Sequence, residues 1–361
     1  MSRDKKITVE KKARRAPVQR QTTLKDIALR VGVSTNHVSL ALRGSPLVSA
    51  ATSEKILQVA AKLDYRPNRL IRAIQSGLTG VVGVVIRPAD AWMSRMISGI
   101  HDVLCQHDTL PLLDWMPSYP EAPPKEGDRT ELEVIHNLLE RRVDGIIVFP
   151  YSEQVSDLYF NEVWERNIPL VTIDRPAPNT HADFVGTDEI KGGGLAAQHL
   201  LELGHRQIGH IAGFHDYGTY FERRHAFEQT VEHAGGNCIS VEVGQYGDSS
   251  DAARELLNRP DRPTAVFLAA DSFALPLYRE ASARGLRIPE DLSVIGYADL
   301  EVCTQITPAL TTIRQDPYQM GCDAARLILN RIGRKNADTA AQQIRLKPEL
   351  VVRGSTAPAV R

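Results

Sequence analysis

The stretch TLKDIALRVGVSTNHVSLALRG, residues 23–44, decides the fold at the amino-terminal end of this chain. Apolar residues recur at helical spacing in its first part, and Gly32 is typical of the residue that ends such a helix. Ser34 predicts the N-cap of a second helix. The spacing of Ala28, Gly32 and Val38 suits two helices that cross steeply through a tight turn. The predicted outward face of the second helix consists of Thr35, Asn36, Ser39 and Leu40.

A third helix is predicted to begin after Ser49 and to close a small core around the first two helices. Its apolar residues on one face are Ile56, Val59, Ala60 and Leu63. Three short helices joined in this way predict a helix-turn-helix DNA-binding domain over residues 21–66. A helical hairpin used for protein contacts is the alternative that the spacing leaves open.

The charge of the chain is strongly uneven along its length. Residues 1–78 contain 16 Lys and Arg against 5 Asp and Glu, whereas the remaining residues contain 27 against 39. A basic segment joined to an acidic body predicts a polyanion as partner, and both nucleic acid and an anionic membrane qualify. Residues 1–20 hold eight basic and two acidic residues. They lack a helical period, which predicts a flexible basic tail, with a purely solubilising extension as the alternative.

Residues 67–79 predict a short hinge helix that follows the DNA-binding domain. Pro67 suits the start of a helix and Gly77 its end. A basic helix of about ten residues is marginal in water when it stands alone. We therefore expect this segment to fold on contact with DNA.

From residue 80 onward the pattern changes to alternating strands and helices. Apolar runs such as Val81–Ile86 and Ala265–Leu268 alternate with helical stretches such as 130–142. This alternation predicts parallel sheets flanked by helices, and the number of strands predicts two lobes with a ligand cleft between them. The further predicted strands are Gly145–Phe149, Leu170–Ile173, Ile208–Ala212 and Val294–Tyr297, and the further helices are Leu195–Leu203 and Ala252–Leu257.

The composition is that of an ordinary globular protein, with 42% hydrophobic and 24% charged residues. This balance excludes a largely disordered chain and a membrane-spanning bundle. No apolar run approaches the ~20 residues of a membrane crossing and no secretory stretch is found, so we expect a cytoplasmic, nucleoid-associated protein. The cysteines lie too far apart for a metal or redox motif and are expected to be buried thiols. They are Cys105, Cys238, Cys303 and Cys322.

Three segments of the amino-terminal part resemble the lactose-repressor family. They are TLKDIALRVGVSTNHVSLALRG (23–44), VSAAT (48–52) and YRPNRLIRAIQSG (65–77). The resemblance implies that the second helix lies in the major groove, where Thr35 and Asn36 read bases, since Asn suits adenine. Ser39 would lie beside them and His37 nearer the backbone. Further DNA contacts, several of them to phosphates, are implied for Thr23, Leu24, Ser34, Arg43, Ser49, Thr52, Asn68 and Ile71.

At two positions of these amino-terminal segments the chain differs from the usual family residue. Leu40 stands where many relatives have an arginine that contacts the operator, so the resemblance implies a different preferred sequence. Ile74 stands where the family usually has a leucine that wedges into the minor groove. A branched apolar side chain can still part a base step. A simple interdomain contact is the alternative for Ile74.

The second part of the chain resembles the effector-binding core of the same family, which is similar to periplasmic sugar-binding proteins. The matching segments are DGIIVFP (144–150), PLVTIDRP (169–176), 185–213, RRHAF (223–227), 284–300 and 306–321. The implied fold is an all-α helix-turn-helix head followed by an α/β core of two doubly wound parallel sheets. The first lobe would span about 80–185 plus 314–337, and the second about 186–313 plus 338–361. The implied effector-binding residues are Arg87, Trp92, Arg223, Tyr246, Asp271 and Tyr297.

The expected ligand follows from the positions that match the family and from those that depart from it. Arg223 matches an arginine that clamps ligand oxygens, with a salt bridge within a lobe as the alternative. Ala270 and Ala298 replace polar residues of the family. Each ligand hydroxyl that this leaves buried and unpaired would cost roughly 1 to 3 kcal/mol of binding free energy. This disfavours a neutral hexose. An anionic, aromatic or phosphorylated ligand held by Arg87 and Arg223, or a core without effector control, are the options left open.

No spacing in the chain supports a catalytic, metal or cofactor site. Gly192, Gly193 and Gly194 lack the Lys and Ser/Thr of a phosphate loop and predict close helix packing, and the histidines reproduce no zinc motif. We therefore expect a regulator without a cofactor, a repressor that binds a double-stranded, nearly palindromic operator as a homodimer or tetramer and responds to a small molecule. A sugar-binding receptor with a basic extension and an enzyme on a doubly wound core are the alternatives.

Overall fold

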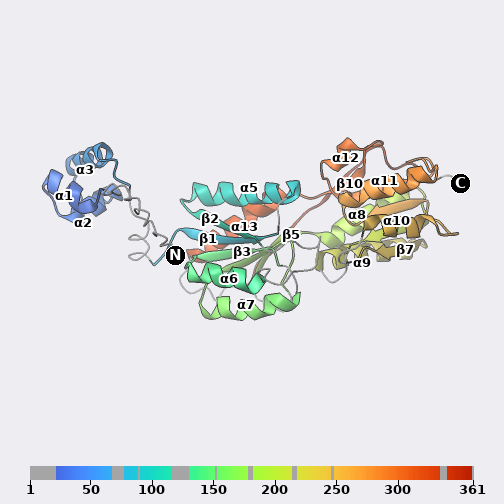
Figure 1. Cartoon of the computed structure of the whole chain (residues 1–361), viewed down its shortest axis with the longest axis horizontal. Helices are drawn as coiled ribbons and strands as arrows, with labels where there is room; N and C mark the ends of the chain where they lie inside the picture. The colour runs from blue at the N-terminus through green and yellow to red at the C-terminus, as the bar shows by residue number, and fades with distance from the viewer. Residues whose placement is uncertain are drawn as a thin grey trace, which may run out of the picture. The chain divides into compact units, whose positions relative to one another are not determined.

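The computed structural model describes residues 22–66, 77–87, 90–115, 130–150, 153–177, 182–213, 218–244, 248–333 and 340–359. The chain forms two compact units that meet in sequence at residues 72 and 73. Within these ranges, the first unit contains α1, α2 and α3, and the second contains two sheets with their helices (Figure 1).

The first unit is a three-helix core whose helices begin at side-chain caps. The helices are α1 (Leu24–Val31), α2 (Thr35–Leu42) and α3 (Ala50–Lys62). Thr23, Ser34 and Ser49 cap them, each accepting a hydrogen bond from a backbone N–H of the first turn. Gly32 ends α1 in the left-handed conformation, with φ 77°. The three predicted helices, the predicted N-cap Ser34 and the predicted helix end at Gly32 are confirmed. The core consists of Ile27, Ala28, Val38, Ala41, Val48, Ile56 and Ala60.

The first lobe of the second unit is built on a six-stranded parallel sheet. Its strand order is β11-β5-β4-β3-β1-β2. Helices α5 (Ala91–Gln106) and α13 (Pro317–Ile332) cover one face, and α6 (Glu131–Glu140) and α7 (Glu153–Glu165) cover the other (Figure 1). The strands are β1 (Val81–Ile86), β2 (Leu110–Trp115), β3 (Gly145–Val148), β4 (Leu170–Ile173), β5 (Asp183–Thr187) and β11 (Gln343–Leu346).

The second lobe repeats this architecture. Its strand order is β12-β10-β9-β8-β6-β7, parallel except for the edge strand β12 (Glu349–Val351). Helices α8 (Glu189–Glu202) and α9 (Gly218–His233) pack on one face, and α10 (Ser249–Leu257) and α11 (Ala274–Ala283) on the other. The remaining elements are β6 (Gln207–Ala212), β7 (Asn237–Glu242), β8 (Ala265–Leu268), β9 (Ser293–Ala298), β10 (Thr311–Arg314), the short 3₁₀ helix η1 (Asp271–Phe273) and α12 (Val302–Gln305).

The chain crosses between the lobes three times, and one of these crossings corrects a predicted boundary. The crossings follow β5, β10 and β11. We expected the chain to return to the second lobe at about residue 338, but β11 pairs in parallel with β5 of the first sheet. Asp183 explains this pairing, because its carboxylate accepts hydrogen bonds from Arg331 at 2.6 Å and from the backbone N–H of Gln342 at 2.7 Å. The chain therefore leaves the first lobe only after Leu346.

Glycines allow the helix pairs of both lobes to approach closely. A Cβ at Gly99 of α5 would clash with the carbonyl oxygen of Tyr318, and one at Gly321 of α13 with that of Met96. In the second lobe, a Cβ at Gly193 would clash with the carbonyl oxygen of Arg223. A Cβ at Gly192 would clash with the side chain of Tyr297. Close packing, the predicted role of this glycine run, is confirmed for these two glycines.

The cysteines are only partly as predicted. Cys303 and Cys322 are buried, but Cys238 is half-buried and Cys105 is exposed on α5. None of the helices in the described ranges is long and apolar enough to span a membrane. The same ranges contain no group of three His, Cys, Asp or Glu side chains arranged to hold a metal ion.

A buried histidine in the second lobe predicts loss of stability in acid. His210 is fully enclosed, its ring stacks on Phe267 at 4.8 Å, and its Nδ1 lies 3.1 Å from the carbonyl oxygen of Phe267. Burial lowers its pKa to about 4 from an ordinary value of 6.5. Between these values the unfolded chain binds the proton and the folded chain does not, so stability falls as the pH drops. We expect the free energy of unfolding to decrease by about 2 kcal/mol between pH 7 and pH 5 from this group.

Urea unfolding at the two pH values measures this effect. The variant His210→Gln, whose side chain has no titration in this range, should show a correspondingly smaller decrease. Equal decreases in the two proteins would contradict the prediction.

Candidate functional site

The amino-terminal turn of α2 presents an exposed polar surface. Thr35, Asn36 and His37 are all exposed there. Ser34 orients this turn, because its Oγ accepts from the backbone N–H of His37 at 3.2 Å and lies 2.9 Å from the His37 Nδ1. The side chain of Asn36 extends from a fixed helix and is free to offer an acceptor and a donor together. This geometry suits the edge of a base in the major groove.

The second half of α2 differs from the prediction. Leu40 was expected on the outward face, but it is half-buried and packs against the three-helix core. Ser39 is half-buried as well, and its carbonyl oxygen accepts a hydrogen bond from Nε of Arg43 at 3.1 Å. Arg43 itself is exposed at the end of the helix. Leu40 lies next to the buried Ala41 at the edge of the apolar face, and spacing alone does not decide on which side of such an edge a residue lies.

The expected phosphate contacts gather at helix starts. Thr23 is exposed, and its hydroxyl donates to Asp26 at 2.7 Å, while Leu24 is half-buried. Ser49 donates to the hydroxyl of Thr52 at 2.9 Å. The N–H groups at a helix start attract anions, so these positions suit a phosphate backbone. Three further predicted contacts, Asn68, Ile71 and Ile74, lie outside the described residues.

In the first lobe, two arginines surround one aromatic ring beyond the ends of the strands. The guanidinium of Arg175 lies 4.7 Å from the ring centre of Phe149, and that of Arg87 lies 5.8 Å from it. Arg87 also pairs with Asp90 at 2.9 Å. Trp92, predicted to line the ligand site, belongs to α5 and is buried in the core of the first lobe.

In the second lobe, Arg223 of α9 takes part in a buried ionic network. It is 6% exposed, its Nε donates to Glu189 at 2.8 Å, and its guanidinium lies 3.5 Å from the ring centre of Tyr297. The other carboxylate oxygen of Glu189 accepts from Gln315 at 3.2 Å, and Gln315 donates to Thr187 at 2.9 Å. Both Glu189 and Gln315 lie at crossings between the lobes. Arg223 therefore connects the second lobe to two of the crossing segments.

Asp174 lies among these charged groups and was not singled out from the sequence. It follows β4 in the left-handed conformation, with φ 64°, and is 9% exposed. Burial raises the pKa of its carboxyl group, and the charges of Arg175, Arg223 and Arg87 oppose that rise. None of the described residues donates a hydrogen bond to this carboxylate. The carboxylates of Asp183 and Glu189, by contrast, each accept a hydrogen bond from an arginine. A polar residue directly after a buried strand, in the segment PLVTIDRP, was the signal that could have found it.

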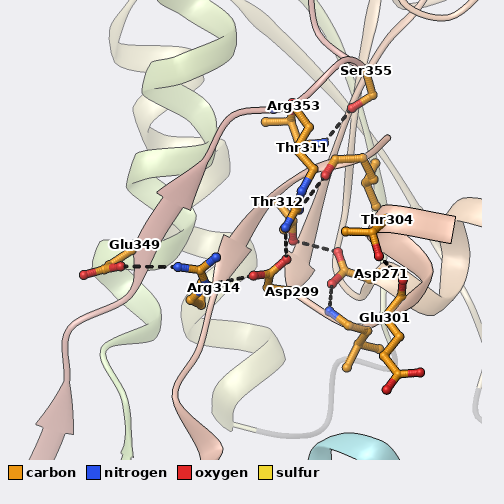
Figure 2. Close-up of polar contacts among 12 residues, drawn as sticks. Asp271, Asp299, Glu301, Thr304, Thr311, Thr312, Arg314, Glu349, Arg353 and Ser355 are labelled. Atoms are coloured by element: carbon orange, nitrogen blue, oxygen red, sulfur yellow. Dashed lines mark hydrogen bonds and ion pairs between the residues drawn. The ribbon is translucent and has the colours of Figure 1, made fainter. Parts of the chain in front are cut away.

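Asp271 and Tyr297 do not face an open site. Asp271 is fully buried and accepts from the hydroxyl of Thr312 at 2.7 Å and from the backbone N–H of Leu300 at 2.9 Å (Figure 2). Tyr297 is fully buried between Gly192 and Arg223. Both side chains therefore hold the second lobe together in this structure. Tyr246, another predicted site residue, lies outside the described residues.

The departure at Ala298 is accompanied by an unusual turn. Ala298 and Asp299 have φ values of 113° and 56°, in the region that favours glycine. The Asp299 carboxylate accepts from Arg314 at 2.7 Å and from Arg353 at 2.6 Å, as Figure 2 shows. These two arginines stabilise the strained turn at the carboxyl end of β9.

Comparisons with known proteins place these two units in one family. Residues 23–68 match the model for bacterial regulatory proteins of the lacI family. Residues 197–356 match a periplasmic binding protein-like domain. The HTH-type transcriptional repressor PurR of Pasteurella multocida is 30% identical over 341 residues, which cover 92% of this chain and 98% of that protein. The chain belongs to the lacI family of bacterial regulatory proteins.

Further lacI-family proteins match along the same length. PurR of Vibrio vulnificus is 31% identical over 337 residues, covering 92% of this chain and 97% of that protein. The solved lac repressor dimer bound to operator and an anti-inducer superposes with a TM-score of 0.79 at 27% identity, covering 94% of this chain and 100% of that one. A complex of the regulator CelR with cellobiose gives a TM-score of 0.66 at 29% identity, covering 93% and 100%. The helix-turn-helix head and two-lobed core predicted from the sequence are confirmed for this lacI-family chain.

Proposed function

We propose that this lacI-family protein is a transcriptional repressor that binds a nearly palindromic operator as a homodimer. The observation that carries the proposal is the exposed turn of α2, where Thr35 and Asn36 project from a capped helix of a basic unit. Each head would read one half-site, since two heads related by a twofold axis require related half-sites. Its homologues are transcriptional repressors, and the proposal includes no catalytic activity. It would act in the cytoplasm, where the chromosome lies.

Control by a small molecule between the lobes is the second part of the proposal. Three crossing segments join the lobes, and Glu189 and Gln315 link two of them to Arg223. A ligand that contacts both lobes would change their relative angle about these segments. A coupling of about 1–3 kcal/mol would change operator affinity roughly 5- to 150-fold.

The charges around Asp174 favour a neutral ligand over an anion. Arg87 is already paired with Asp90, and Arg223 with Glu189. The carboxylate of Asp174 accepts no hydrogen bond from the described residues, and an anion placed beside it would leave it without a donor. A ligand that donates O–H or N–H groups to Asp174 would complete the hydrogen bonding of this buried group. We therefore favour a neutral polyol or an N–H-bearing ring over the anionic ligand that the sequence suggested.

Selection of bound duplexes from a random DNA pool tests the proposed function, and Asn36→Ala tests its mechanism. The wild-type protein should enrich a nearly palindromic sequence. The variant loses a paired contact to one base, which contributes about 1–3 kcal/mol per half-site. We expect operator affinity to fall and discrimination to relax at one base pair in each half-site, while binding to unrelated DNA stays unchanged.

The matched control is Gln58→Ala, which removes an exposed amide from α3, away from the turn of α2. It should leave the selected sequence unchanged. If Asn36→Ala enriches the same bases as the wild type with equal stringency, Asn36 is not a base reader.

A further inference from the structure

The second unit begins with a tightly held turn at residues 77–80. Gly77 and Gly80 both adopt the left-handed conformation, with φ values of 74° and 70°. Between them, Thr79 donates to one carboxylate oxygen of Asp144 through its backbone N–H at 2.7 Å and through its hydroxyl at 3.0 Å. The backbone N–H of Gly80 donates to the other oxygen at 2.7 Å. Three donors from two consecutive residues thus converge on one carboxylate.

Asp144 is itself part of a rigid region of the first lobe. It lies in the turn between α6 and β3, and its backbone N–H donates to the carbonyl oxygen of Val81 at 2.8 Å. Strand β3 pairs with β1 and β4 in the interior of the sheet. The carbonyl oxygen of Gly80 also accepts from Leu110 of β2 at 2.8 Å. The turn at 77–80, which leads into β1, is therefore fixed to β2 and to the residue before β3.

We propose that the carboxylate of Asp144 is a positioning residue for operator binding. It holds Thr79 and Gly80, the residues at which the chain enters the first lobe, in one orientation. The inference rests on the proposed function, because it needs two heads that bind one operator.

The physical reason is the geometry that a bivalent reader needs. When one head of a dimer is bound, the second binds at an effective concentration that depends on how closely its position matches the other half-site. Charge-assisted hydrogen bonds from two backbone N–H groups and a hydroxyl hold the exit of the chain in one orientation. Water in place of this carboxylate would satisfy the same donors without fixing the direction of the exit.

The variant Asp144→Ala tests the role through half-site spacing. The readout is binding to the selected operator and to versions with one or two base pairs inserted between the half-sites. The wild-type protein should bind the altered spacings at least about tenfold more weakly, whereas Asp144→Ala should distinguish them by less than about threefold. The variant should bind the best operator about tenfold more weakly than the wild type, and a single half-site equally well.

Two further variants separate positioning from a general loss of stability. Thr130→Ala removes the N-cap of α6 in the same lobe and leaves the turn at 77–80 intact. It should keep the wild-type preference for spacing. Asp144→Asn retains one acceptor oxygen and should restore part of that preference.

Each outcome addresses one claim. If Asp144→Ala keeps the wild-type preference for spacing, or if Thr130→Ala loses it to the same degree, the inference is overturned. If the wild-type protein selects no operator at all, the proposed function fails before Asp144 is tested.

Discussion

Removal of residues 1–78 should abolish specific binding of this protein to duplex DNA. The deletion takes away the three-helix unit and the basic residues around it, and leaves a body with 27 basic against 39 acidic residues, which DNA repels. Because specific operator affinity typically exceeds non-specific affinity by about 10³–10⁷, we expect a loss of at least about 10³-fold. Equilibrium binding to the selected operator at several salt concentrations measures it.

The truncated protein supplies its own control. It begins at Thr79, which remains bound to Asp144, so the core should unfold at an unchanged temperature. The intact protein should lose affinity steeply as salt rises, because its basic residues release counterions from the phosphates. A truncated protein that still prefers the operator over unrelated DNA would place the reading surface in the core and refute the proposed function.

The second large effect is expected at the buried ion pair of the second lobe. Arg223→Ala leaves the carboxylate of Glu189 enclosed without its guanidinium partner. Removing one member of a buried pair costs about 3–5 kcal/mol, because the remaining charge stays desolvated. Urea unfolding should show this decrease in the free energy of unfolding.

The neighbouring pair provides a matched comparison. Arg224 forms ion pairs with Glu228 and Glu242 that are partly exposed to solvent. Water screens such pairs, so Arg224→Ala should cost less than about 1 kcal/mol. The double variant Arg223→Met with Glu189→Leu should recover much of the stability lost in Arg223→Ala, because the Glu189 carboxylate no longer stays buried without a partner. If Arg223→Ala and Arg224→Ala lower the free energy of unfolding equally, burial does not determine the stabilising contribution of the Arg223 pair.

Local signals predicted the three helices of the first unit and six strands of the core, but not β2, β5, β7, β10, β11 or β12. β1, Leu170–Ile173 and Ala265–Leu268 have the predicted ends, and the caps Thr23, Ser34 and Ser49 begin the expected helices. Caps and apolar spacing act within one or two turns of chain, so they are visible in the sequence. The pairing of β11 was not predicted. A short strand at the edge of a sheet forms because of the neighbouring strand it pairs with, and its own residues give little signal.

The candidate site was harder to predict than the fold. Asn36 and Arg223 were proposed as site residues from the sequence, and for Arg223 both a ligand contact and a salt bridge were left open. In the structure, Arg223 forms an ion pair with Glu189, 34 positions earlier in the chain. Asp271 was expected to face the ligand, but its hydrogen bonds turn it toward Thr312 and Leu300. Such choices depend on which donors surround a carboxylate after folding.

The amino-acid order of this chain specifies a basic three-helix reader joined to an acidic core of alternating strands and helices, because periodicity, caps and charge are properties of neighbouring residues. Only folding decided that Asp144 accepts hydrogen bonds from Thr79 and Gly80, and that Asp174 lies near three arginines. The partners of Asp144 lie more than sixty positions away from it. Hydrogen bonds and burial between such distant residues exist only once the sheets have brought them together.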